Sequence, residues 1–168
     1  MTDRSIRHAT FTIERTFDAP PQRVWRAWST REAKAAWFGG PPEWGEDEFE
    51  LDFRVGGREV SRGGPPGGPI YTYEATYRDI VPGERFVYAY DMYTDDVRIS
   101  VSLGAVELAP EGAGTMLIYT DHGAYLDGLD TPEEREHGTN ELLDALDRVL
   151  AGEPATTLSW RSHGADAA

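Results

Sequence analysis

Hydrophobic and polar residues alternate at every second position along most of the chain, which is the pattern of half-buried β-strands. Gly56-Gly57 predicts a bend or bulge after the second alternating stretch, and the glycines and prolines of residues 63–69 predict a loop. Short spacing between the stretches favours an antiparallel meander over parallel βαβ units. The alternating stretches are residues 10–17, 49–55, 71–77, 86–92 and 97–103, and a last strand is expected from Thr115 to about Asp121.

The apolar side of each stretch is the side that a half-buried strand turns toward the core. In residues 97–103 the odd-numbered positions are apolar, and they lie opposite Arg98, Ser100 and Ser102. In the strands rich in tyrosine, Tyr73, Tyr88 and Tyr90 share the apolar parity and are expected to face inward. Several inward phenol groups need hydrogen-bond partners, which an enclosed cavity with polar groups in its wall would supply.

Helical spacing follows the first strand and returns near the C terminus. Val24, Trp25 and Trp28 share a face of a short helix, and a second short helix is expected through about Ala36. Thr131-Pro132-Glu133-Glu134 has the composition of a helix N-cap, a proline at the first helical position and an acidic first turn. An apolar stripe at helical spacing then predicts one long helix, formed by Leu142, Leu143, Leu146, Val149 and Leu150.

These elements predict an α+β domain in which a curved antiparallel sheet wraps around the long C-terminal helix, with two short helices after the first strand. We expect an N-terminal segment at residues 1–9, the folded domain at residues 10–152 and a polar, mobile tail at residues 153–168 in which Trp160 could dock. A strongly bent sheet cannot touch its helix everywhere. A cavity between the two is therefore expected, and such cavities bind small ligands.

Composition narrows the class of partner. The chain has 168 residues, enough for one domain, with 16 basic and 30 acidic residues and a net charge of -14. This charge repels phosphate backbones, so nucleic acid is an unfavoured partner. The chain has no cysteine, no apolar run long enough for a membrane span and no apolar N-terminal stretch typical of a signal peptide. We therefore expect a cytoplasmic protein that does not insert into membranes.

Motifs for common enzyme mechanisms are missing from the sequence, which has no GxSxG, HExxH, Walker loop or GxGxxG after a strand. The four histidines are dispersed, and we expect no metal and no cofactor. Asp121 and His122 end the last strand, where a side chain can reach the mouth of a cavity. They are weak catalytic candidates together with Tyr119, because neighbouring strand residues point to opposite faces of the sheet.

The aromatic residues form a larger candidate set. Most aromatic side chains are core residues, but tyrosine and tryptophan also carry a polar tip that can orient a ligand. The predicted ligand-binding residues are Trp37, Phe38, Tyr73, Tyr88, Tyr90 and Tyr119.

Five short motifs in this order resemble the activator of Hsp90 ATPase homologue 1-like family, which sits in the START-like, Bet v 1-like superfamily. The likeness spans residues 10–152, and the motifs are FDAPP at 17–21, VWRAW at 24–28, AWFGGP at 36–41, DxRxGG at 52–57 and IxPxERF at 80–86. The resemblance implies the helix-grip fold. One departure concerns the last helix, where many relatives have a Gly-Trp pair and this chain has Gly138-Thr139, which would enlarge the cavity or change its lining.

The resemblance and the residues together leave three functions to weigh. The first is a protein that binds a small hydrophobic, aromatic or lipid-like molecule in the cavity, with no catalysis. The second is a polyketide cyclase-like or hydrolase-like enzyme that uses an acid–base residue at the cavity mouth. The third is an interaction protein like the Hsp90 co-chaperones, which the resemblance names. The sequence leaves monomer or homodimer open.

Overall fold

A computed structural model describes residues 3–45 and 48–153. The expected tail, with Trp160, lies outside the described residues apart from Glu153. No helix among the described residues is both long and apolar enough to cross a membrane. The elements, in chain order, are β1 (Ile6–Phe17), α1 (Pro21–Ser29), α2 (Arg31–Ala35), the 3-10 turn η1 (Pro42–Trp44), β2 (Glu48–Leu51), β3 (Arg58–Gly63), β4 (Tyr71–Val81), β5 (Arg85–Thr94), β6 (Val97–Glu111), β7 (Gly114–Leu126) and α3 (Pro132–Leu150).

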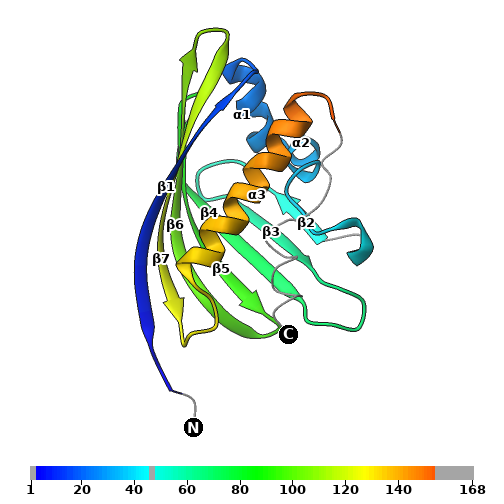
Figure 1. The fold of residues 1–168 in the computed structure, drawn as a ribbon, viewed down its shortest axis with the longest axis vertical. Helices are drawn as coiled ribbons and strands as arrows, with labels where there is room; N and C mark the ends of the chain where they lie inside the picture. Colours follow the sequence, from blue (N-terminus) through cyan, green and yellow to red (C-terminus); the bar gives the residue numbers. More distant parts are fainter. Residues whose placement is uncertain (1–2, 46–47, 154–168) are drawn as a thin grey trace.

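The strands form one antiparallel sheet of seven strands in the order β1-β7-β6-β5-β4-β3-β2. Consecutive strands from β2 to β7 are neighbours, and β1 is the edge strand beside β7. The two pair along the full length of β1, from Ile6 opposite Leu126 to Phe17 opposite Thr115. The sheet curves, and α3 crosses its concave side (Figure 1). This is the predicted α+β helix-grip architecture, except that the first strand begins at Ile6 rather than Thr10.

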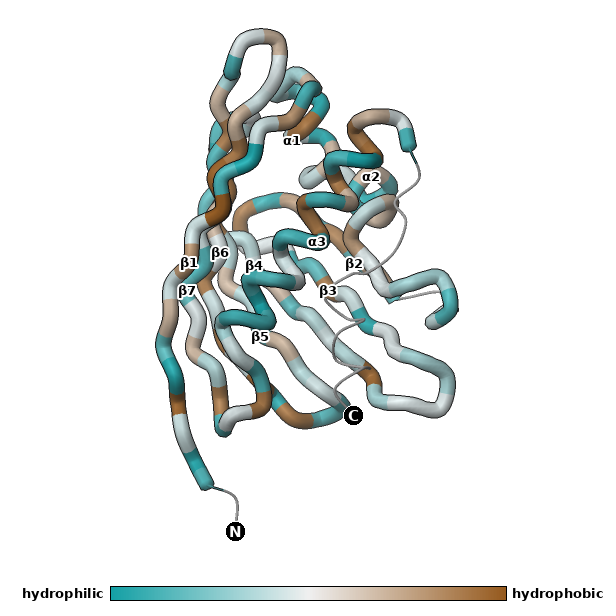
Figure 2. Tube along the Cα trace, viewed as in Figure 1, coloured by the Kyte–Doolittle hydropathy of each residue, from teal (hydrophilic) through white to brown (hydrophobic). Residues whose placement is uncertain are grey.

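The long helix α3 begins as its sequence predicts. Thr131 is the N-cap, and its Oγ1 accepts a hydrogen bond from the Glu134 amide at 3.1 Å, while Pro132 occupies the first helical position. Leu142, Leu143 and Leu146 are buried against the sheet. The turns of α3 that face away from the sheet are hydrophilic (Figure 2). The amphipathic helix therefore supplies one wall of the core.

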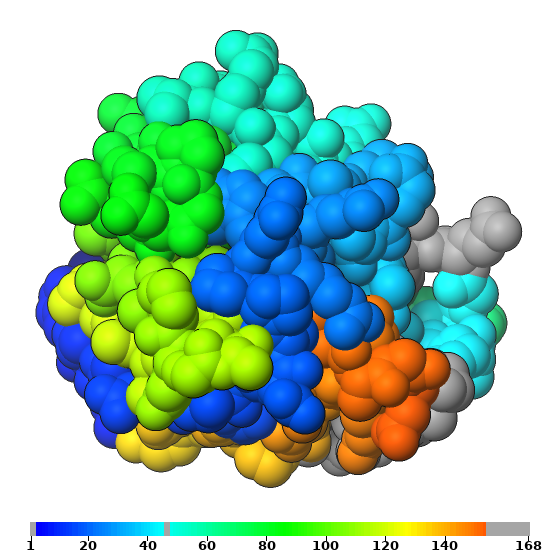
Figure 3. All heavy atoms as spheres, turned by 90° about the horizontal axis from the view of Figure 1, so that it is seen from above, coloured from blue at the N-terminus to red at the C-terminus, as the bar shows by residue number. Residues whose placement is uncertain are grey.

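Helices α1 and α2 cover one end of the space between the sheet and α3. Viewed from above, α1 lies beside the β6–β7 turn and the C-terminal end of α3 (Figure 3). Val24, Ala27 and Trp28 are the buried residues of α1. Trp37, just after α2, packs edge-on against Trp28 with 4.6 Å between ring centroids, and its Nε1 donates a hydrogen bond to the Ala27 carbonyl at 3.0 Å. The two short helices are thus held together by aromatic packing.

The sequence-based prediction is wrong for residues 49–55 and misses a strand. β2 ends at Leu51, because the chain turns between Asp52 and Gly57, and Val55 is 58% exposed rather than buried. The unpredicted strand is β3, whose inward residues are Glu59 and Ser61. A strand that buries polar residues carries no hydrophobic alternation, so its sequence gives no periodic signal.

The predicted orientation of the first half of β6 is also reversed. Ser100 and Ser102 are buried on the concave side, whereas Val101 and Leu103 are 42% and 43% exposed on the convex side. The reason is a buried arginine: the Arg135 guanidinium on α3 donates to Ser100 Oγ at 2.8 Å. A charged group that is buried on the concave side needs polar neighbours. The serines of this strand segment therefore face inward, and its apolar residues face outward.

Candidate functional site

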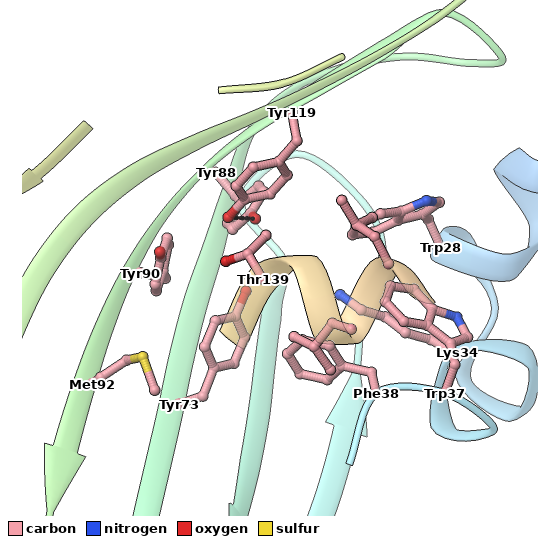
Figure 4. Close-up of a pocket in the computed structure, with 12 residues that line it drawn as sticks. Trp28, Lys34, Trp37, Phe38, Tyr73, Tyr88, Tyr90, Met92, Tyr119 and Thr139 are labelled. Carbon is pink, nitrogen blue, oxygen red and sulfur yellow. Dashed lines mark hydrogen bonds between the residues drawn. The ribbon is translucent and has the colours of Figure 1, made fainter. Parts of the chain in front are cut away.

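A cavity of about 40 Å³ lies between the concave side of the sheet, α3 and the segment around α2. Figure 4 shows tyrosines from the sheet on one side of it and the residues around α2 on the other. The lining is mostly aromatic and aliphatic, with phenol groups, one hydroxyl and one amine among it. The lining residues are Trp28, Lys34, Trp37, Phe38, Tyr73, Tyr88, Tyr90, Met92, Tyr119, Thr139, Leu142 and Leu143.

The six residues predicted to bind a ligand all line this one cavity: Trp37, Phe38, Tyr73, Tyr88, Tyr90 and Tyr119. The inward parity of β4 and β5 brings Tyr73, Tyr88 and Tyr90 to the cavity, and Trp37 and Phe38 reach it from the segment that follows α2. Thr139, the second residue of the Gly138-Thr139 pair, also lines the cavity from the second turn of α3.

Lys34 forms a buried ion pair at the α2 end of the cavity. Its Nζ lies 2.6 Å from Glu59 Oε1, and Lys34 is 2% exposed while Glu59 is fully buried. The Tyr77 hydroxyl donates to the same carboxylate oxygen at 2.5 Å. Among the described residues, Glu59 Oε2 has no hydrogen-bond partner. Lys34 therefore joins the cavity, which it lines, to a buried carboxylate and a phenol behind it.

Local structure explains why Lys34 points inward. The Lys34 amide donates to the Thr30 carbonyl at 2.9 Å, and the Phe38 amide donates to the Lys34 carbonyl at 2.9 Å, so α2 fixes both flanks of the residue. Its Nζ lies 4.6 Å from the centroid of the Phe38 ring and 5.4 Å from that of Trp28. Aromatic faces stabilise a cation in the absence of water. Burial lowers the pKa of the Lys34 ammonium, and the nearby Glu59 carboxylate opposes this shift.

A chain of hydroxyl groups lies at the opposite side of the cavity. The Tyr88 hydroxyl donates to the Tyr119 hydroxyl at 3.0 Å (Figure 4). The Tyr119 hydroxyl in turn donates to Asp121 Oδ2 at 3.0 Å. The Tyr90 hydroxyl donates to the same oxygen. Burial raises the pKa of Asp121, and the bonds from Tyr90 oppose the shift. Burial also raises the pKa values of Tyr88 and Tyr119 well above their usual range.

The absence of a side chain at Gly104 on β6 leaves room for the Tyr88 ring, which lies close to the backbone there. An added Cβ at Gly104 would lie 2.5 Å from Cζ of Tyr88, on the facing strand β5. A side chain at this position would therefore push the Tyr88 ring away from Tyr119.

Arg135 supports the Tyr90 side of the site from α3. Its guanidinium donates to the Tyr90 hydroxyl at 3.0 Å and pairs with Asp130. It also lies 5.5 Å from the Tyr90 ring centroid and 5.4 Å from that of Tyr125. The arginine is a positioning residue: it orients Tyr90 and, through Tyr90, the Asp121 carboxylate.

The three catalytic candidates separate in the structure. Tyr119 lines the cavity, and Asp121 is buried directly behind it. His122 points to the opposite side of the sheet, where it is exposed and its Nδ1 lies 2.8 Å from Thr10 Oγ1. The expectation that His122 reaches the cavity mouth is therefore wrong, because side chains alternate along a strand that has not yet ended.

Sequence reasoning missed the charged members of the site. Lys34 could have been noticed from the sequence, because it is the only lysine of the chain and lies between two tryptophans. Glu59 and Arg135 gave no signal of their own, because their burial depends on partners that are distant in the sequence. Among the described residues, no three His, Asp or Glu side chains gather as metal ligands.

Comparison with known proteins assigns the family. The family model described as activator of Hsp90 ATPase homolog 1-like protein matches residues 18–151. A protein from Rhizobium leguminosarum is 43% identical with a TM-score of 0.86, over 90% of this chain and 100% of that chain. The Rhizobium loti protein Mll3558 is 45% identical with a TM-score of 0.79, over 85% of this chain and 97% of that chain.

A more distant solved structure, protein CV1439 from Chromobacterium violaceum, is 28% identical with a TM-score of 0.71, over 84% of this chain and 96% of that chain. No curated protein matches the chain. The matching family model, the identity to the two Rhizobium proteins and the helix-grip architecture agree, and the chain belongs to the activator of Hsp90 ATPase homolog 1-like family.

Proposed function

We propose that this protein binds a small hydrophobic or aromatic molecule in the cavity between its sheet and α3. The observation that supports the proposal most strongly is the composition of the cavity wall: large apolar surfaces with a few polar groups from Lys34, Tyr88 and Tyr119 aimed at one space. Ligand sites in proteins combine an apolar wall with a small number of orienting polar groups in this way.

The size of the cavity sets a condition on binding. At about 40 Å³ it exceeds the roughly 10–15 Å³ that one water needs, but it is smaller than the engineered cavity of about 150 Å³ that holds benzene. An aromatic ligand therefore requires outward movement of a wall residue. We expect Phe38 to be the residue that moves, because it lies in the connecting segment between α2 and η1 rather than within a helix or a strand.

A panel of hydrophobic and aromatic compounds tests this function through the melting temperature, since a ligand of the native state raises it. Thr139→Leu should reduce the shift by filling the cavity. Thr120→Leu, the same substitution on the convex side of β7, is the control and should keep it. A panel without any stabilising compound, or equal shifts in both variants, would contradict binding in this cavity.

A second candidate function is acid–base catalysis at the Tyr88–Tyr119–Asp121 chain. The favouring observation is a buried carboxylate that two phenols contact and that connects through Tyr119 to Tyr88 in the cavity wall. Such a chain can carry a proton between a bound molecule and Asp121. Asp121→Asn distinguishes the two functions: it should abolish turnover of any substrate while leaving the binding of that compound within a few fold of wild type.

A further inference from the structure

Lys34 and Glu59 form a constellation that simple ligand binding does not require. An amine lies 2.6 Å from a carboxylate oxygen, and Tyr77 donates a hydrogen bond to that same oxygen. A nucleophile, a proton acceptor within hydrogen-bond distance and a third group that orients the acceptor are the parts of an activated nucleophile. Lys34 lines the cavity, so its Nζ faces the space where a small molecule would sit.

The cavity also fits a particular size of reactant. A volume of about 40 Å³ holds about three waters, and therefore a compound of two or three non-hydrogen atoms, without any movement of the wall. Phe38 and Trp28 flank the Nζ at 4.6 and 5.4 Å from their ring centroids, and their faces stabilise a cationic product.

We propose that Lys34 is a covalent binding site for small carbonyl compounds, aldehydes in particular, which it holds as an imine. The proposal rests on the proposed function, because it uses the same cavity, and it names the chemical class of the molecule that binds at the Lys34 end of that cavity. Burial lowers the pKa of the Lys34 ammonium, which eases the transfer of one of its protons to Glu59.

The reaction balances within the residues described. Lys34 passes one proton to Glu59, and its Nζ forms a bond to the carbonyl carbon as the carbon–oxygen double bond opens. Both remaining Nζ protons leave with the carbonyl oxygen as water, and the proton on Glu59 returns to the nitrogen. The ion pair of Lys34 with Glu59 thus becomes an ion pair of an iminium with Glu59, and one water is released. Glu59 Oε2, without a partner among the described residues, can accept a hydrogen bond from the intermediate hydroxyl.

The experiment uses acetaldehyde with sodium cyanoborohydride, which reduces the imine to a stable secondary amine. Because Lys34 is the only lysine, an untagged chain offers Lys34 and the N-terminal α-amine as its amine sites, and the second serves as an internal reference. Peptide mapping by mass spectrometry gives the ratio of labelling at the two sites at pH 7. We expect this ratio to be on the order of tenfold higher in the folded protein than in urea. An equal or lower ratio in the folded protein overturns the proposal.

A phenol-to-phenyl pair tests the role of the carboxylate. Tyr77→Phe removes the hydrogen bond that orients Glu59 and keeps the ring, so labelling of Lys34 should fall several-fold. Tyr93→Phe, at a half-buried phenol that bonds Arg98, is the control and should leave labelling unchanged. Equal labelling in Tyr77→Phe and wild type overturns the role given to Glu59.

Failure here is separable from failure of the proposed function. Thermal stabilisation by hydrophobic compounds without labelling of Lys34 refutes the covalent site and leaves reversible binding in place. Labelling of Lys34 without stabilisation by any hydrophobic compound refutes the wider ligand function and supports the covalent site.

Discussion

Replacing Lys34 by methionine leaves the Glu59 carboxylate buried without its positive partner. The two groups are 2.6 Å apart, and both side chains are almost fully removed from solvent. At an effective dielectric constant of about 20, two unit charges at this separation attract by about 6 kcal/mol, most of which offsets the cost of removing the charges from water. The attraction disappears in the variant, whereas the cost of burying Glu59 remains.

Removal of one partner from a buried ion pair lowers the free energy of unfolding by about 3–5 kcal/mol. We expect this loss for Lys34→Met, which is a large part of the roughly 5–15 kcal/mol that a domain has. The double variant Lys34→Met/Glu59→Gln should be more stable than the single variant by about 2 kcal/mol, because the neutral amide can still accept the bond from Tyr77 and carries no charge.

Urea unfolding followed by tryptophan fluorescence measures these values, since Trp28 and Trp37 flank the site. Arg85→Met is the matched control: Arg85 pairs with Asp79 at 2.9 Å, but the two side chains are 56% and 44% exposed. That exposed pair should contribute less than about 1 kcal/mol. A loss below about 1 kcal/mol for Lys34→Met, or a double variant less stable than the single one, would refute the desolvated ion pair.

Three further substitutions test other parts of the site. Gly104→Ala should lower the free energy of unfolding by about 1–3 kcal/mol in urea titration, because the new methyl group overlaps the Tyr88 ring; an unchanged value would mean that Tyr88 can move freely. Phe38→Ala should cost about 3–5 kcal/mol and enlarge the cavity, so that indole raises its melting temperature more than that of wild type; equal shifts would exclude Phe38 as the limiting wall. Asp121→Asn tests the raised pKa of Asp121. Between the ordinary carboxyl pKa and the raised one, the folded state binds more protons than the unfolded state, so wild type should gain stability relative to the variant as the pH falls from 7 to 4. Urea titrations in which wild type instead loses stability relative to the variant would contradict the shift.

Hydrophobic periodicity predicted the parts of the fold whose inward residues are apolar. The alternation of β4 and β5 placed Tyr73, Tyr88 and Tyr90 on the concave side, and the leucine stripe with its threonine cap located α3. These signals are local, because each strand or helix buries its own apolar residues. The fold class and the aromatic wall of the cavity were therefore predictable.

The charged part of the site was not predictable by the same means. Glu59 and Ser61 face inward on β3, and Ser100 and Ser102 face inward on β6, so these strands bury polar residues where the pattern expects apolar ones. Their burial is stabilised by Lys34, 25 residues from Glu59, and by Arg135, 35 residues from Ser100. Pairings at such separations leave no mark on local alternation, and only the folded sheet brings the partners together.

The most direct test of the central claim is an NMR measurement of contacts between a stabilising compound and the methyl groups of the protein. If the molecule binds between the sheet and α3, intermolecular nuclear Overhauser effects will connect it to the methyl groups of Met92, Leu142 and Leu143, which line the cavity. Effects that instead reach the methyl groups of Val101 and Leu103, exposed on the convex side of the sheet, would contradict the account.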